Sequence, residues 1–328
     1  MKKLLRMTLA TALSGALALP LMSASVHAKD EWPTDTVRMV VPYAAGGTTD
    51  VLSRRVAELL QRELGNVVVE NRPGAGSTTG TGRLARGGRD ADHTLLMASP
   101  GHTIGAAIYP GLRYDPTEDF TFIQNIIDIP NVMVVPASSP YQTVQEFVEA
   151  ARTEGKTFSS SGVGSSIHMS GELFKTLTET KMTHVPFRGS GEALPALLSG
   201  DVDVSFENMP TVLSHIKSGS LRALAVTSQT RSEYLPDVPT LDEIGDYNLE
   251  GFNATAWFGL IAHKSFPDVA VEKVHAALDK IMQEEDFLNF IAQLGAAPGE
   301  QADEEFKAFV ADEVQRWKQV AAQAGLKN

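Results

Sequence analysis

Cysteine is absent from the 328 residues of this sequence. Its absence excludes disulfides, thiolate metal sites, a cysteine nucleophile and a lipid-anchored cysteine. The eight histidines are scattered along the chain, and no two of them have zinc-ligand spacing on one predicted helix. We therefore expect no metal and no cofactor.

Basic residues are in the minority: 28 lysines and arginines stand against 40 aspartates and glutamates, for a formal net charge of −12. Such an acidic chain is an unfavourable partner for nucleic acid. A small anionic ligand is not excluded, because the field of exposed charges fades over about 8 Å at physiological salt. A local site built from backbone groups dominates at contact.

Long apolar segments are confined to the first 28 residues. Lys2, Lys3 and Arg6 form a basic start, residues 7–21 are apolar or small, and Val26-His27-Ala28 matches a signal-peptidase site. We predict a signal peptide over residues 1–28, and its removal takes the formal net charge from −12 to −15. Export and the lack of cysteine favour a soluble protein of a bacterial periplasm.

Recognisable catalytic motifs are missing as well. The sequence has no phosphate-loop pattern and no nucleophile-elbow spacing around a serine. Residues 74–80 (GAGSTTG) imitate a dinucleotide fingerprint, but the spacing departs by one residue and no acidic residue ends the next predicted strand at Ala98. We expect a protein that is not an enzyme.

The most informative stretch that is present covers residues 37–55 (VRMVVPYAAGGTTDVLSRR). It predicts a buried strand, a turn at Pro42 and Gly46-Gly47, and a helix whose N-cap chemistry comes from Thr48, Thr49 and Asp50. Unpaired backbone N–H groups and the positive end of a helix dipole meet at such a turn. It is therefore either an anion site or an ordinary connection capped by Asp50.

Similar strand-turn-helix units recur along the chain. Predicted strands at residues 94–98, 157–161 and 182–186 run into SPGHT, GVGSSIH and FRGSG. This alternation predicts an α/β fold with parallel strands and ligand sites at their carboxyl ends. Roughly 300 mature residues favour two domains.

Several side chains in these turns allow two interpretations. His102 and His168 either cap and pack their turns or contact a ligand, directly or through water. Arg188 either clamps a carboxylate with its planar fork or forms a structural ion pair. Tyr43 either contacts a ligand or closes the surface, and Asp50 is better interpreted as a cap than as a ligand contact.

Ordered blocks across the mature chain carry a family resemblance. They include VRMVVPYAAGGTTD, VVVENRPGAGSTTG, ASPGHT, GVGSSIHMSGELFK, HVPFRGSGEALPALLSGDVDVSF and AWFGLIA. In these blocks the sequence resembles the Bug (TctC-type) family, the extracytoplasmic solute receptors of tripartite tricarboxylate transport systems. Tyr43 stands where the family often has phenylalanine.

The resemblance implies a type II periplasmic-binding fold, with two α/β lobes joined by two crossing strands and a ligand cleft between them. Residues 29–128 and 252–328 are expected to form lobe 1, and residues 129–251 to form lobe 2. The implied ligand is a small carboxylate, either a dicarboxylate or an aromatic acid, with an amino acid left open. The implied partners are the membrane subunits of a tripartite tricarboxylate transporter, and a monomer is expected.

The expected ligand-binding residues lie in the glycine-bearing turns of both lobes. They are Tyr43, Ala45, Gly46, Gly47, Thr48, Thr49, Ser99, His102, Ser161, Gly162, Gly164, Ser165, Ser166, His168, Phe187 and Arg188. Presentation of the ligand to a membrane sensor kinase stays open as an alternative to transport.

Overall fold

The computed structural model describes residues 31–323 and 325–326. The predicted signal peptide, residues 1–28, lies outside the described residues. Strand β1 (Val37–Val41) and helix α1 (Thr48–Leu64) form the strand-turn-helix unit that the sequence predicts. The N-cap of α1 is Gly47 and not one of the three predicted polar residues, so Thr48 is already the first helical residue.

The first sheet region begins with three parallel strands. Strand β1 lies between β2 (Val67–Asn71) and β3 (Thr94–Ala98), with Met39 opposite both Val69 and Leu95. Strand β9 (Thr255–His263) then pairs antiparallel with β3. The sheet is therefore mixed, while the sequence pattern predicts only its parallel part.

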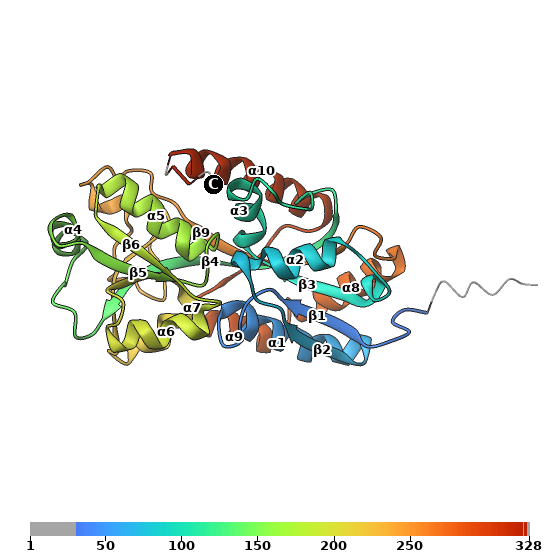
Figure 1. Cartoon of the computed structure of the whole chain (residues 1–328). Helices are drawn as coiled ribbons and strands as arrows, with labels where there is room; N and C mark the ends of the chain where they lie inside the picture. The colour runs from blue at the N-terminus through green and yellow to red at the C-terminus, as the bar shows by residue number, and fades with distance from the viewer. Residues whose placement is uncertain (1–30, 324, 327–328) are drawn as a thin grey trace, which may run out of the picture. The chain divides into compact units, whose positions relative to one another are not determined.

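Strand β4 (Phe120–Pro136) links the two sheet regions (Figure 1). Its first part pairs antiparallel with β9 as far as Pro130, and from Asn131 onward it pairs antiparallel with β7 (Val204–Asn208). The sequence predicts two strands broken at Ile129-Pro130, and that break is wrong. Pro130 lacks only its own N–H, so the chain stays extended at the point where β4 exchanges partners.

The second sheet region continues from β4 in the order β7, β5 (Lys156–Ser160) and β6 (Met182–Pro186). Phe158 of β5 lies opposite His184 and Val204, in parallel pairing on both sides. Strand β8 (Leu221–Val226) and the short β10 (Ala297–Pro298) both pair antiparallel with β4. The carboxyl ends of β5, β6 and β7 therefore meet at one edge.

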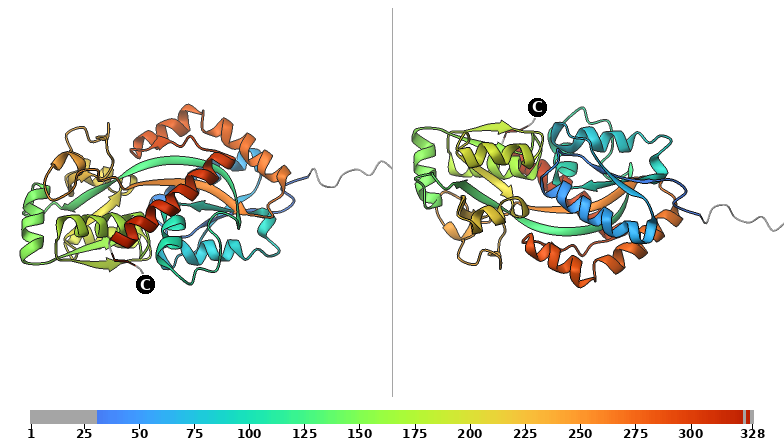
Figure 2. Two further views of the ribbon diagram at one scale, coloured as in Figure 1. Left: turned by 90° about the horizontal axis from the view of Figure 1, so that it is seen from above. Right: turned by 90° about the horizontal axis from the view of Figure 1, so that it is seen from below.

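Helices cover both faces of each sheet region, as the two further views show (Figure 2). Their bounds are α2 (Thr78–Ala85), α3 (Pro100–Ile108), α4 (Val144–Thr153), α5 (Ser166–Thr178), α6 (Ser190–Ser199), α7 (Met209–Lys217), α8 (Asp268–Ile281), α9 (Glu285–Gln293) and α10 (Asp303–Gln323). None of the helices in the described part of the chain is long and apolar enough to cross a membrane.

Each sheet region has its own buried apolar core. In the first region, Leu52 of α1, Val274 of α8 and Phe287 of α9 pack against one face. In the second region, Phe147 of α4 and Phe174 of α5 belong to one core cluster. Burying one large apolar side chain stabilises the folded state by roughly 1.5–3 kcal/mol. These cores are therefore the main term that stabilises the fold.

Helix α10 packs against both sheet regions. Phe306 and Val310 near its start pack with Trp257 of β9, whereas Trp317 and Ala321 near its end belong to the core of the second region. The left view of Figure 2 shows α10 lying across β4 and β9. The predicted lobe boundaries, residues 29–128 with 252–328 and residues 129–251, stay a prediction.

Candidate functional site

Five helices begin around one small cavity. Their N-caps are Gly47 of α1, Ser99 of α3, Ser165 of α5, Gly189 of α6 and Asn208 of α7. Each of these helices follows a strand, so the pattern arises from parallel strands whose carboxyl ends meet. The first amides of a helix have no carbonyl partner within it, and the dipole adds positive potential there. The cavity is therefore surrounded by donors suited to an anion.

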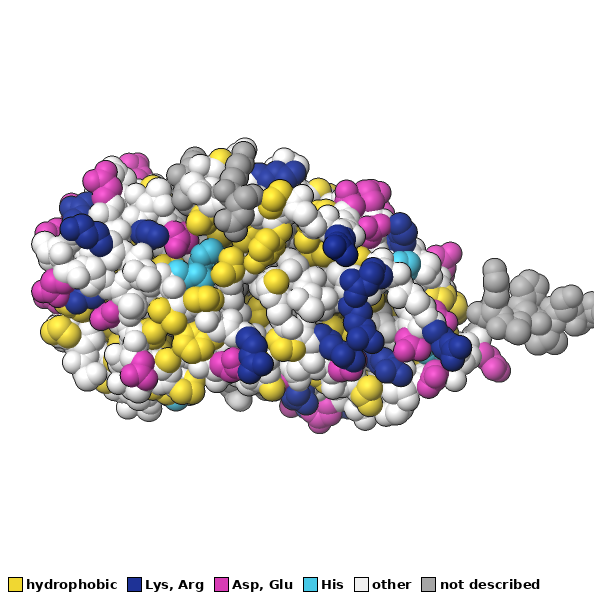
Figure 3. Space-filling view, viewed as in Figure 1, with side chains coloured by type: hydrophobic (Ala, Val, Ile, Leu, Met, Phe, Trp, Pro, Cys, Tyr) yellow, Lys and Arg dark blue, Asp and Glu magenta, His cyan; other side chains and the backbone are white. Residues whose placement is uncertain are grey.

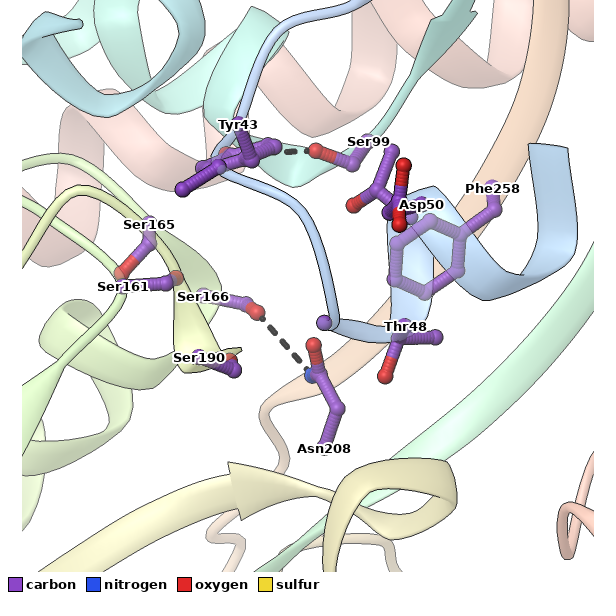
Figure 4. Close-up of a pocket in the computed structure, with 13 residues that line it drawn as sticks. Tyr43, Thr48, Asp50, Ser99, Ser161, Ser165, Ser166, Ser190, Asn208 and Phe258 are labelled. Atoms are coloured by element: carbon purple, nitrogen blue, oxygen red, sulfur yellow. Dashed lines mark hydrogen bonds between the residues drawn. The ribbon is translucent and has the colours of Figure 1, made fainter. Parts of the chain in front are cut away.

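Polar groups from both sheet regions form the wall of this cavity, and Figure 4 shows them facing one another. The lining residues are Tyr43, Ala44, Gly47, Thr48, Thr49, Asp50, Ser99, Ser161, Ser165, Ser166, Ser190, Asn208 and Phe258. None of these thirteen described residues is a lysine or an arginine. The donors are hydroxyls, one side-chain amide and backbone N–H groups.

The cavity has a volume of about 20 Å³. That volume holds about one water molecule. The turns that bound it are in contact with each other, since the Ala44 N–H donates to the Arg188 carbonyl at 3.1 Å. The hydroxyls of Thr48 and Thr211 also lie 3.0 Å apart across the same boundary. A larger ligand therefore requires these turns to separate.

Asp50 is the one ionisable carboxyl in the lining, and its hydrogen bonds are directed into its own lobe. Its Oδ2 accepts from the Gly46 N–H and from Arg54 Nε, both at 3.0 Å, and its Oδ1 accepts from Asn71 Nδ2 at 2.9 Å. Burial raises the pKa of Asp50, but the hydrogen bonds from Arg54, Gly46 and Asn71 outweigh burial, and the pKa lies below its usual value. Asp50 therefore fixes the β1–α1 turn from inside the first turn of α1, although it is not the N-cap that the sequence predicts.

Tyr43 and Ser99 are hydrogen-bonded to each other at the wall formed by the first sheet region. The Ser99 hydroxyl donates to the Tyr43 hydroxyl at 3.3 Å, and the Tyr43 hydroxyl donates to the Gly76 carbonyl at 3.5 Å. Both side chains are buried. Burial raises the pKa of Tyr43 above its ordinary value, so its hydroxyl is a neutral donor.

A hydrogen-bonded chain leads from the cavity to the strand that joins the sheet regions. Asn208 Nδ2 donates to Asn131 Oδ1 at 2.6 Å, and Asn131 Nδ2 donates to Ser170 Oγ at 3.1 Å. The Asn131 N–H in turn donates to Thr227 Oγ1 at 3.0 Å. The position of Asn208 is therefore fixed by β4 at the point where that strand exchanges partners.

The structure brings eight of the predicted site residues to the cavity. They are Tyr43, Gly47, Thr48, Thr49, Ser99, Ser161, Ser165 and Ser166. Gly162, Phe187 and Arg188 instead line an adjoining hollow at the rim, which Tyr43 and Ser161 share. Arg188 is exposed and forms an ion pair with Glu192 at 2.8 Å. Of the two interpretations of Arg188, the structure shows the structural ion pair.

Five predicted residues line neither the cavity nor the adjoining hollow. The Ala45 carbonyl packs against Gly191, and the Gly46 N–H is held by Asp50. The Gly164 N–H donates to His168 Nδ1 at 3.2 Å. These two residues therefore stabilise the turn between β5 and α5 without lining the cavity. Burial, followed by the charges of His184 and Lys175, lowers the pKa of His168 to about 3, and the imidazole is a neutral acceptor.

His102 is the fifth residue, and it is part of the core. Its ring packs edge-on against Phe120 with centroids 4.9 Å apart, and its Nε2 lies 2.6 Å from the Pro116 carbonyl. Burial lowers the pKa of His102 to about 4. Of its two interpretations, the structure shows the packing one.

Ala44, Asp50, Ser190, Asn208 and Phe258 line the cavity but were not predicted as ligand contacts. Ser190 follows Gly189 in a turn whose neighbours Phe187 and Arg188 were predicted, so its position could have been found. Asn208 ends a strand without a glycine, and Phe258 lies within β9. No group of three or more His, Cys, Asp or Glu among the described residues could hold a metal ion.

The family model for the tripartite tricarboxylate transporter family receptor, TctC, matches residues 52–326. The chain belongs to this family. It is thus a periplasmic solute-binding receptor of the TctC type, as the ordered sequence blocks indicate.

Solved structures with the same fold agree with this assignment. The periplasmic binding protein BugD is 31% identical, with a TM-score of 0.85, and the match covers 90% of this chain and 99% of that one. Rpa4515 of R. palustris with adipate is 32% identical, with a TM-score of 0.84 and the same coverage. MatC of Rhodopseudomonas palustris with bound malate is 31% identical, with a TM-score of 0.83, covering 88% and 99%. The TctC-type receptor therefore has the periplasmic-binding fold expected from its sequence.

Proposed function

We propose that this TctC-type receptor binds a linear dicarboxylate in the cavity between its two sheet regions. The observation that carries the proposal is the convergence of five helix N-termini on a cavity whose described lining contains no basic side chain. Such a site binds carboxylate through oriented N–H groups and hydroxyls. The two solved relatives with adipate and malate support a dicarboxylate over an aromatic acid.

The donors fall into two sets that face each other. The amides of Thr48 and Thr49, at the start of α1, form one set. The Ser161 and Ser166 hydroxyls belong to the other set, on the second sheet region, beside Ser190, whose hydroxyl donates to Glu207. A molecule with a carboxylate at each end matches two opposed donor sets.

Thr49 and Ser161 are the side chains best placed to contact the ligand. Both are buried and line the cavity. Neither hydroxyl has a hydrogen-bond partner among the described residues, whereas the Ser99 and Ser190 hydroxyls already donate to Tyr43 and Glu207. The Thr49 and Ser161 hydroxyls are therefore available to the carboxylates.

The energetics are adequate without a salt bridge. Hydrogen bonds to a charged group contribute about 1.5–3 kcal/mol each, and micromolar affinity needs about 8 kcal/mol net. Two carboxylates that each accept two or three such bonds reach this value after association and ordering are subtracted. A ligand that contacts both donor sets favours the closed arrangement, because those contacts exist only when the turns approach each other.

We further infer that the chain is secreted through its cleaved N-terminal signal peptide and delivers the dicarboxylate to the membrane subunits of a tripartite tricarboxylate transporter. The family to which the chain belongs supports this partner. Delivery rather than turnover is in keeping with the receptor family to which the chain belongs. Each ionisable group near the wall has a hydrogen-bond donor of its own: Asp50 accepts from the Gly46 N–H, His168 from the Gly164 N–H, and Glu207 from the Asn208 N–H.

The experiment is isothermal titration calorimetry of purified protein that has been unfolded and refolded to remove carried ligand. Malate, adipate, citrate, benzoate and glutamate are the titrants. We expect binding of malate or adipate and an affinity loss of about tenfold or more in Thr49→Val, since one charge-assisted hydrogen bond is removed. Thr153→Val is the matched control, because Thr153 is exposed and its hydroxyl bonds only carbonyls of its own helix.

Binding of benzoate with no response to either dicarboxylate would overturn the ligand class. Equal affinities of Thr49→Val and Thr153→Val would overturn the site. Delivery is tested separately by uptake of the labelled ligand into cells that carry the membrane subunits, with and without the receptor. Uptake that does not depend on the receptor would contradict the transport role.

A further inference from the structure

Five arginines line two neighbouring hollows outside the cleft. Arg38, Arg83 and Arg89 line a hollow of about 220 Å³, together with Glu70 and Asp90. Arg86 and Arg113 line a second hollow of about 470 Å³. We call the five arginines the basic surface. Figure 3 shows a concentration of Lys and Arg side chains beside the position that α2 has in Figure 1.

Four of the five arginines of the basic surface differ from the other arginines in their pairing, whereas Arg38 pairs with Asp90. Arg83, Arg86, Arg89 and Arg113 are exposed, and none has an ion pair or hydrogen bond with a described residue. Every other arginine in the described part of the chain has such a partner. The arginines without a partner are thus all on one surface.

Four of these arginines have no neutralising partner among the described residues. Arg83 in the last turn of α2 and Arg86 at its C-cap are three residues apart, a spacing at which like charges repel, although both lie at the end of the helix that favours a cation. The chain as a whole has a formal net charge of −12, so a surface with several unpaired arginines is opposite in sign to the rest of the chain. A local field of this sign attracts an anionic partner and orients its approach.

The chemistry of the basic surface favours carboxylates on a protein segment. The planar guanidinium fork binds a carboxylate through two parallel hydrogen bonds. The arginines lie around two hollows, and hollows accept the side chains of an extended segment better than a flat layer of lipid headgroups. A chain with a strong net negative charge is also repelled by an anionic membrane as a whole.

We propose that the basic surface docks an acidic segment of a partner protein. None of its five arginines lines the cleft cavity, so docking and ligand capture use different residues. The second hollow shares Ala75 and Tyr109 with the hollow at the cleft rim, which places the docked segment next to the cleft entrance. The proposal rests on these surface residues and not on the identity of the ligand.

The test measures binding of a fluorescent peptide of eight glutamates to purified full-length protein by anisotropy, at low and at physiological salt. We expect saturable binding that weakens with salt. The variant Arg83→Gln/Arg86→Gln/Arg113→Gln should bind about tenfold more weakly, because three charged contacts are removed. The matched control is Lys181→Gln/Lys217→Gln/Lys318→Gln, which removes the same charge from exposed lysines elsewhere.

Thermal unfolding and dicarboxylate calorimetry on both triple variants separate this proposal from folding and from the proposed function. Unchanged values with a loss of peptide binding only in the arginine variant support the basic surface. Equal peptide binding by the two variants overturns it. Binding to phosphatidylglycerol vesicles without binding to the peptide also overturns it, and so does displacement of the peptide by free malate.

Discussion

Ser190 Oγ donates a hydrogen bond to Glu207 Oε1 at 2.6 Å. The Asn208 N–H donates to the same oxygen at 2.9 Å, and both Ser190 and Asn208 line the cleft cavity. Glu207 is 1% exposed and has no ion-pair partner among the described residues. Burial, only partly offset by the bonds from Ser190 and Asn208, raises the pKa of Glu207 to about 7. A carboxyl directly behind the site therefore changes charge near neutral pH.

The first prediction concerns stability. A carboxyl whose pKa is raised in the folded state contributes stability that is fully present below its unfolded pKa, near 4, and is lost as pH rises through about 7. We expect the free energy of unfolding of wild type to fall by on the order of 2–3 kcal/mol between pH 4 and pH 8 relative to Glu207→Gln. The amide keeps the acceptor for Ser190 and carries no charge. Urea denaturation across this range measures the difference.

Glu149→Gln is the control, because Glu149 is exposed. Parallel pH profiles for wild type and Glu207→Gln would show that Glu207 does not titrate in this window.

The second prediction concerns affinity at the same position. A dicarboxylate bound beside Ser190 and Asn208 is repelled by an ionised Glu207, so its affinity for wild type should fall as pH rises through about 7. In Glu207→Gln the affinity should be nearly constant from pH 6 to pH 8. Calorimetry with malate at three pH values measures this. A fall of equal size in both proteins would assign the effect to another group.

The strand-turn-helix units were predictable because each carries its own local signals. Strand β3 and strand β6 begin and end where the sequence predicts. The continuity of β4 through Pro130 was not predictable in this way. It depends on pairing with β9 and β7, strands that lie far away in the chain. A proline punctuates local structure, but long-range pairing decides whether a strand ends there.

The candidate site was likewise predictable in part from local sequence signals and in part not. Ser99 and His102 come from one motif, yet Ser99 is the N-cap with an extended backbone and His102 lies inside α3, so one side chain lines the cavity and the other enters the core. Asn208 has no glycine before it to indicate a turn. Its place follows from its pairing opposite Asn131. Motif patterns thus predict which turns meet, while tertiary packing selects the side chains that face inward.

The third prediction concerns the anchor of the β1–α1 turn. Asp50→Asn places an amide donor among the donors of Gly46, Arg54 and Asn71, so we expect a loss of about 1–3 kcal/mol in unfolding free energy and weaker malate binding. Because the pKa of Asp50 is lowered, its contribution is present above its unfolded pKa and is lost as pH falls through the folded value. Urea denaturation at pH 7 and at pH 3 should show the two proteins converging in acid.

Arg54→Gln removes the cation that pairs with Asp50 and so tests the contribution of the ion pair apart from that of the carboxylate. The Arg54 side chain is 53% exposed, so this change should cost no more than about 1 kcal/mol, and Asp50 keeps the Gly46 and Asn71 donors. Equal losses in the two variants would mean that the ion pair alone fixes the turn.

The last prediction tests the contact between the two sets of turns. A Cβ on Gly191 would overlap the Ala45 carbonyl oxygen on the opposite side of the cleft. Gly191 lies in the first turn of α6, where alanine is the better helix former by about 1 kcal/mol, so Gly191→Ala should fold at least as well as wild type. The closed arrangement would be overpacked by about 1–3 kcal/mol, which corresponds to an affinity loss of about tenfold to a hundredfold.

Calorimetry with malate measures that loss, and small-angle scattering measures closure as the fall in radius of gyration at saturating ligand. Gly111→Ala is the matched control, since a Cβ there meets no atom within 4 Å. We expect Gly111→Ala to bind and close like wild type and Gly191→Ala to remain more open at equal saturation. Wild-type affinity and scattering in Gly191→Ala would show that the ligand is held without close approach of the Ala45 and Gly191 backbones. The donor sets on the two sheet regions would then have to reach the dicarboxylate through longer side chains or water.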